Sequence, residues 1–194
     1  SSFYQPSTSY RWKKRTDKPN PLLKPWQQRL ASYKKTLEKA PAAEKTALRR
    51  KIDHAERVIE ELKRYSFLIS EYDPFIVVPL GVVNQSTPFS PQFGDYAVVI
   101  VGDKLYPALV GDAGPRYKTG EGSLRLSREI NPKAGPYSRP VSDLKVSYLI
   151  FPGSAEPEAG PPDYEKITDR CRELLNEIGG VGKGFNLHQW EDLL

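Results

Sequence analysis

The chain has 194 residues, with 29 Lys and Arg against 24 Asp and Glu, and a formal net charge of +5. A single cysteine excludes an internal disulfide. The sequence has no apolar run long enough for a signal peptide or a membrane span. We therefore expect one main domain with attachments, secreted after removal of any targeting segment.

The excess of positive charge lies at the N-terminus. Residues 1–65 carry 17 Lys and Arg against 7 Asp and Glu, whereas residues 153–194 carry 4 against 9. Residues 1–20 are polar and basic, which predicts a flexible arm. Residues 21–65 repeat apolar side chains at spacings of three and four, which predicts a helical hairpin. Its stripe comprises Trp26, Leu30, Tyr33, Leu37, Leu48, Ile52, Ala55, Ile59 and Leu62.

The basic faces of this hairpin have two interpretations. They are either the solvated side of a hairpin that packs against the main domain, or an electrostatic patch for an anionic polymer. No nucleic-acid-binding motif accompanies the charge, so we expect no nucleic-acid partner.

Residues 66–153 contain several short apolar stretches, which predict β-strands. Candidate strands run over 75–80, 97–101, 105–110 and 144–151, and Gly102-Asp103 suits a tight hairpin turn. The spacing predicts an α+β protein built on a compact β-barrel of about six strands.

Residues 154–194 are predicted to form a C-terminal helix and tail. Tyr164, Ile167, Cys171, Leu174 and Ile178 fall on one helical face. Cys171 is therefore expected to be a buried structural thiol. The two histidines, His54 and His188, have no clustered metal ligands at a suitable spacing, so we expect no zinc site.

Two carboxylates stand among glycines after the central strands. Asp112 follows the apolar run 105–110, where a strand is expected to leave the sheet, and Glu121 precedes a stretch that opens a short helix. A loop of this length can bring both side chains to one cleft. The alternative is an ordinary surface loop, because turns are commonly rich in glycine and acidic residues.

The segments 94–112 and 120–124, with 72–79 before them and 151–154 after them, resemble the family 75 glycoside hydrolases, the chitosanases. The resemblance covers roughly residues 70–153. It implies an endo-hydrolase of β-1,4-linked glucosamine polymers that inverts the anomeric centre. It also implies that Asp112, in the GD motif, and Glu121, in the GEAS motif, are the essential carboxylates. The chain departs from that motif at Gly122, where Ala is expected.

Strand ends of this kind also resemble those of the double-psi barrels, so we expect a double-psi-like barrel by analogy. Asp112, beside an apolar barrel, is the better candidate for a raised pKa and for the general acid. Glu121, at a helix start, suits the general base. Because sugars stack on aromatic rings and glucosamine is cationic, we expect substrate binding by Asp95, Tyr96, Tyr117 and Asp143.

The reaction needs neither a metal nor an organic cofactor, and we expect a monomer whose partner is its polysaccharide substrate. Two other functions stay open. A lytic transglycosylase of peptidoglycan would use Asp112 alone, and a wall-glycan-binding module would have no activity.

Overall fold

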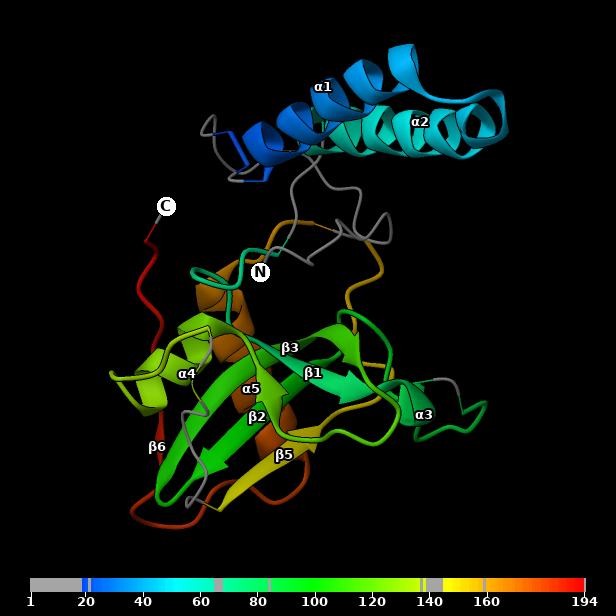
Figure 1. Ribbon diagram of the computed structural model, residues 1–194. Coiled ribbons are helices and arrows are strands. Elements are labelled where there is room, and N and C mark those ends of the chain that lie inside the picture. Colours follow the sequence, from blue (N-terminus) through cyan, green and yellow to red (C-terminus); the bar gives the residue numbers. More distant parts are fainter. Residues whose placement is uncertain are drawn as a thin grey trace. The chain divides into compact units, whose positions relative to one another are not determined.

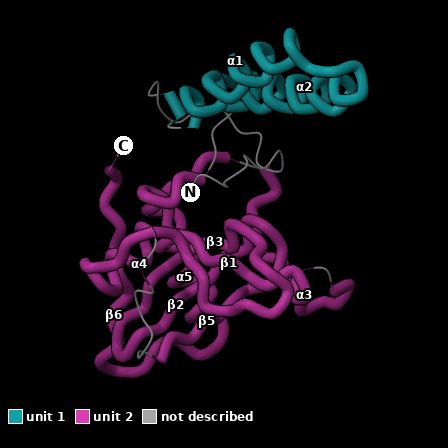
Figure 2. Tube along the Cα trace, viewed as in Figure 1, with its two compact units in different colours: residues 1–67 teal, residues 68–194 magenta. Residues whose placement is uncertain are grey.

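The computed structural model describes residues 19–20, 22–64, 68–83, 85–136, 138, 145–158 and 160–193 (Figure 1). The chain divides into two compact units, residues 1–67 and 68–194 (Figure 2). Most of the predicted N-terminal arm, residues 1–18, lies outside the described residues. None of the helices in the described ranges combines the length and the apolar character needed to cross a bilayer.

Unit 1 contains the predicted helical hairpin. Helix α1 runs over Leu23–Lys39 and α2 over Ala42–Arg64, with Ala40 and Pro41 between them. The apolar stripes form a small core of their own, in which Trp26 of α1 packs with four residues of α2, namely Ala55, Val58, Ile59 and Leu62. Burial of each large apolar side chain stabilises the folded state by roughly 1.5–3 kcal/mol, so burial of the stripe explains why the two helices pack together.

Unit 2 combines a sheet with three helices. Its elements, in chain order, are β1 Phe75–Pro79, α3 Leu80–Val83, β2 Tyr96–Val101, β3 Lys104–Gly114, β4 Glu121–Gly122, α4 Leu124–Ile130, β5 Val146–Ile150, α5 Tyr164–Glu177 and β6 Asn186–Leu187. The predicted strands are therefore present, and the predicted turn at Gly102-Asp103 joins β2 to β3, with Gly102 at φ +61°.

The strands form one curled, half-barrel sheet in the order β4-β1-β3-β2-β5, and β6 pairs with the start of β3 (Figure 1). The expectation of a closed barrel is wrong. In the described part of the chain the end strands β4 and β5 do not pair, and β4 has only two residues with which to do so. A side-chain hydrogen bond connects the two end strands, since the Tyr148 hydroxyl of β5 donates to the Glu121 carbonyl at 3.1 Å. The double-psi analogy stays a prediction.

Helix α5 packs against β2 and β3. Cys171 on this helix is fully buried, and its thiol donates to the Ala97 carbonyl at 3.4 Å. Burial raises the pKa of this thiol to about 12. The prediction of a buried structural cysteine is confirmed. The predicted apolar stripe is correct up to Leu174, but Ile178 lies beyond the last helical residue and is exposed.

Candidate active site

Asp112 and Glu121 both lie on strands, whereas the sequence suggested the end of a strand for Asp112 and the start of a helix for Glu121. Asp112 is inside β3, which continues to Gly114, and Glu121 is the first residue of β4. The predicted short helix after Glu121 is confirmed, since α4 begins at Leu124 with Ser123 as its N-cap, but Glu121 itself lies in β4 and not at the helix start. The exposed loop 115–120 separates the two strands.

Strand β1 brings the two carboxylates together. It lies between β3, with which it runs parallel, and β4, with which it runs antiparallel. Val77 of β1 is the register partner of Asp112 on one side and of Glu121 on the other. Residues in register on neighbouring strands point to the same face of a sheet. Asp112 and Glu121 therefore share a face and flank Val77.

Gly114 makes room for the Glu121 carboxylate. A Cβ atom placed on Gly114 would lie 2.7 Å from Oε2 of Glu121 and 3.1 Å from Cγ1 of Val77. The Glu121 side chain thus leans across β1 and rests over the backbone of β3. A glycine inside a strand often marks such a close approach.

Strand geometry then sets the separation of the two carboxyl groups. Asp112 and Gly114 are two residues apart on β3, which is about 6.6 Å along the strand. Because the Glu121 carboxylate lies over Gly114, it lies about one two-residue step of β3 away from the backbone of Asp112.

The surroundings of Asp112 favour its protonated form. Its side chain reaches solvent, but nearby protein atoms remove part of its hydration, and this desolvation raises its pKa above the ordinary value. The Ala113 N–H donates to Oδ1 of Asp112 at 2.8 Å and lowers the pKa, whereas the charge of Glu121 raises it. The net direction is the one that a general acid requires.

Three neighbouring residues hold Glu121 in position, through its carboxylate, its backbone carbonyl and the turn that follows it. Lys118 forms an ion pair with Oε1 of its carboxylate, so the two oxygens have different environments. Tyr148 donates to its backbone carbonyl, and burial together with the Glu121 charge raises the pKa of Tyr148 to about 12. The buried Ser123 anchors the following turn, since its N–H donates to the Phe75 carbonyl at 2.8 Å.

The departure from the family motif at Gly122 has a local reason. A Cβ on Gly122 would lie 3.1 Å from Cδ2 of Leu126, 3.3 Å from the Phe75 carbonyl oxygen and 3.7 Å from the Tyr148 hydroxyl. The absence of a side chain relieves this crowding next to Glu121.

Asp95 does not face a substrate. Its side chain is fully buried, and both oxygens accept backbone hydrogen bonds, from Gln92 at 2.7 Å and from Ala155 at 3.0 Å. The role predicted for Asp95 in substrate binding is therefore corrected to a structural one, because both carboxylate oxygens hold backbone groups near the start of β2.

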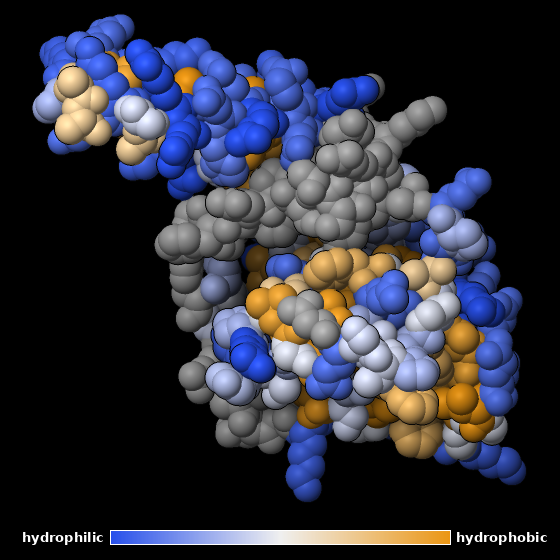
Figure 3. Space-filling view, turned by 90° about the vertical axis from the view of Figure 1, so that its right-hand side faces the viewer, coloured by the Kyte–Doolittle hydropathy of each residue, from blue (hydrophilic) through white to orange (hydrophobic). Residues whose placement is uncertain are grey.

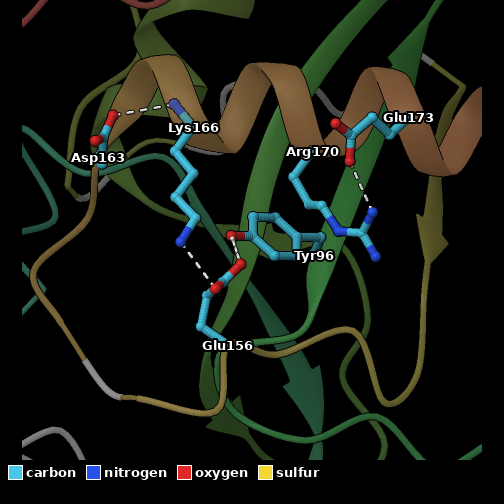
Figure 4. Close-up of polar contacts among 6 residues, drawn as sticks. All are labelled: Tyr96, Glu156, Asp163, Lys166, Arg170 and Glu173. Atoms are coloured by element: carbon cyan, nitrogen blue, oxygen red, sulfur yellow. Dashed lines mark hydrogen bonds and ion pairs between the residues drawn. The ribbon is translucent and has the colours of Figure 1, made fainter.

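Tyr96 is also a structural residue rather than a sugar-stacking one. Its ring is 3% exposed, and its hydroxyl donates to Glu156 at 2.8 Å (Figure 4). Lys166 donates to the other oxygen of Glu156 at 2.8 Å, and these two hydrogen bonds, that of Lys166 first, lower the Glu156 pKa. Burial raises the pKa of Tyr96 itself. The three side chains tie the segment after β5 to α5 and to β2.

A hollow of about 340 Å³ lies along the same stretch of α5. It is lined only by charged side chains, namely Asp163, Glu165, Lys166, Asp169, Arg170 and Glu173. Arg170 pairs with Glu173 at 2.8 Å, and Lys166 pairs with Glu156 (Figure 4). The two cations that line the hollow, Lys166 and Arg170, are thus paired with carboxylates. We therefore do not place the reaction there.

Of the remaining predicted residues, Tyr117 is 89% exposed on the loop between the two carboxylates, where a sugar ring can reach it. Asp143 lies outside the described residues. Within the described ranges, no cluster of three or more His, Cys, Asp or Glu side chains could hold a metal ion.

Sequence reasoning missed Gly114 and Tyr148. Gly114 was read as a loop residue, although a glycine that continues a strand pattern indicates close packing. Tyr148 lies in the predicted strand 144–151, but nothing in the sequence pattern distinguishes it from the other residues of that strand.

The sequence model of the family described as fungal chitosanase of glycosyl hydrolase group 75 matches residues 24–184. The chain belongs to this family. The matched region extends the resemblance over 70–153 in both directions and includes most of the helical hairpin. The protein is therefore an enzyme, a chitosanase-family glycoside hydrolase whose substrate is a polysaccharide. No curated protein matches the chain.

The packing of Gly114 generates a prediction for this chitosanase-family enzyme. In Gly114→Ala the new methyl group displaces the Glu121 carboxylate. Because misplacement of a catalytic group by about 1 Å can cost on the order of 10²-fold, we expect the turnover rate on chitosan to fall at least tenfold. Since the far end of a flexible side chain yields, the melting temperature should change little.

Gly160→Ala is the matched control. A Cβ on Gly160 meets no atom within 4 Å, so both rate and melting temperature should stay at the wild-type values. Equal rates for the two variants would show that the position of the Glu121 carboxylate does not matter.

Proposed function

We propose that the protein cleaves chitosan internally with inversion, with Asp112 as the general acid and Glu121 as the general base. One observation supports this proposal most directly: Val77 is in register with both Asp112 and Glu121. In addition, the missing side chain of Gly114 leaves space for the Glu121 carboxylate. Two carboxyl groups on one sheet face are what glycosidic hydrolysis requires.

The protonated Asp112 donates its proton to the glycosidic oxygen, and the bond from that oxygen to the anomeric carbon breaks. Glu121 accepts a proton from water, which attacks the anomeric carbon from the opposite face of the ring. Lys118 occupies Oε1 of Glu121, so Oε2, above Gly114, is the oxygen that takes the proton. Exchange with solvent then returns both carboxyl groups to their starting forms.

The spacing supports inversion over retention. Inverting glycosidases separate their carboxyl groups by about 6.5–9.5 Å to admit water, and retaining ones by about 5–5.5 Å. The two-residue step of about 6.6 Å along β3 between Asp112 and Gly114, over which the Glu121 carboxylate lies, supports a separation that admits water. The internal mode of cleavage and an extracellular place of action are carried over from the family resemblance.

The first prediction here concerns the carboxylates themselves. Asp112→Asn and Glu121→Gln keep the size of each side chain but remove its ability to transfer a proton. Each should lower the rate on chitosan by on the order of 10²–10⁴-fold, with an unchanged melting curve. Near-normal activity of Glu121→Gln would refute the two-carboxylate mechanism and favour the single-Asp transglycosylase reaction, which product mass distinguishes.

A second prediction concerns pH. Asp112 must be protonated, so activity is lost as the pH rises through its raised pKa. The negative charge of Glu121 contributes to that raised pKa. In Glu121→Gln the pKa of Asp112 should fall, and the alkaline limb of the residual kcat/KM profile should move to lower pH.

Glu129→Gln is the control for this experiment, because it removes the same charge from α4, where the carboxylate lies near His188. Its alkaline limb should coincide with that of the wild type. A limb that stays in place in Glu121→Gln would mean that Asp112 is not the titrating acid.

A third prediction is stereochemical. Inversion at a β-linked glucosamine unit produces the α-anomer first, and proton NMR of the earliest products should detect it before mutarotation. Initial appearance of the β-anomer would require a covalent or substrate-assisted intermediate, and Glu121 could then not act as the base.

A further inference from the structure

The loop between β3 and β4 places a lysine against the Glu121 carboxylate. A turn in this loop closes where the Lys118 N–H donates to the Pro115 carbonyl at 3.1 Å. The Lys118 ammonium forms an ion pair with Oε1 of Glu121, whereas Oε2 lies over Gly114. Lys118 therefore holds a positive charge beside the carboxylate to which we assign the activation of water.

This positive charge is open to a bound ligand. The Lys118 side chain is 61% exposed, and the Glu121 side chain is 30% exposed. An exposed ion pair contributes little to folding stability. The charge of Lys118 is therefore available to act on a ligand at Glu121, and the fold does not depend on it.

A second cation stands on the same loop. Arg116 is exposed, and its side chain lies along α3, since a Cβ placed on Gly81 would be 3.4 Å from Cγ and 3.9 Å from Nε of Arg116. Figure 3 views unit 2 from the side on which α3 lies in Figure 1, and hydrophilic residues stand among hydrophobic ones at the surface there. Residues 115–121 carry two cations and one carboxylate, a net charge of +1. The loop thus repels a positively charged group that approaches Glu121.

The group that varies along a chitosan chain lies next to the atom that water attacks. In the proposed mechanism Glu121 directs water to the anomeric carbon, C1, of one sugar. The neighbouring C2 of that sugar carries either a free amine, which is protonated and positive, or an acetylated amine, which is neutral. An exposed charge acts over about 10 Å at 0.1 M salt, so the charge of Lys118 reaches this group.

We propose that Lys118 is a specificity-determining residue, which favours an N-acetylated unit over a charged glucosamine unit at the sugar that water attacks. An ammonium group on that sugar meets the like charge of Lys118, whereas a neutral acetamide does not. The position of the sugar rests on the proposed function, whereas the polysaccharide as substrate rests on the family.

The test digests a partly N-acetylated chitosan and identifies the new reducing ends by mass spectrometry, because the attacked sugar becomes the reducing end. The two kinds of unit compete within one polymer, so the ratio of their products measures the ratio of their kcat/KM values, and any overall loss of rate cancels. Lys118→Met keeps the length of the side chain without its charge. In this variant the ratio of acetylated to free reducing ends should fall about three- to tenfold.

Two variants serve as controls. Lys118→Arg keeps the charge and should retain the wild-type ratio. Lys104 is exposed and lies at the start of β3, eight residues before Asp112, which is about 26 Å along the strand. This distance exceeds the range of a screened charge, so Lys104→Met should also keep the wild-type ratio.

Salt tests the same charge without a substitution. Raising the ionic strength screens an exposed charge, so the wild-type ratio should fall toward that of Lys118→Met. The ratio given by Lys118→Met itself should change less over the same range of salt.

An unchanged ratio in Lys118→Met would overturn the proposal, as would an equal fall in Lys118→Arg or in Lys104→Met. These outcomes are distinct from a failure of the proposed function, which is near-normal activity of Glu121→Gln. The ratio of reducing ends is measured with both carboxylates intact.

Discussion

The pairing of β1 between β3 and β4 is the constraint on which the candidate site depends. Val77 has Asp112 on one side and Glu121 on the other, so two residues nine positions apart in sequence point to the same sheet face. Gly114 completes the arrangement because the missing side chain admits the Glu121 carboxylate. Neither strand alone would place both groups, and the geometry is therefore a property of the sheet.

The short strand β4 needs outside support, since two residues of pairing are too few to fix the position of the Glu121 side chain. Ser123 supplies part of it by capping α4 while its hydroxyl accepts from the Phe75 N–H at 3.3 Å. Tyr148 supplies the rest from β5, at the far edge of the sheet. The half-barrel curl thus has a function, because it brings β5 close enough to fix the strand that carries Glu121.

Three aspartates of unit 2 illustrate how burial separates structural from chemical carboxyl groups. Asp73 and Asp95 are almost completely buried, and each accepts backbone hydrogen bonds that fix a turn. Asp112 reaches solvent, and the partial desolvation of its carboxyl outweighs the hydrogen bond from the Ala113 N–H, so its pKa rises.

The sequence by itself determined the helical hairpin, the β2–β3 turn and the C-terminal helix with Cys171 inside, and it pointed to Asp112 and Glu121 as the candidate carboxylates. These features depend on local periodicity, turn chemistry and a short motif, which neighbouring residues specify. Only the tertiary structure decided that the sheet stays open, that Glu121 lies on a strand, and that Asp95 and Tyr96 are buried. Those outcomes depend on which strands pair and which side chains meet across them, such as Tyr148 with Glu121. Contacts between residues distant in sequence leave no periodic pattern along the chain, so the sequence could not reveal them.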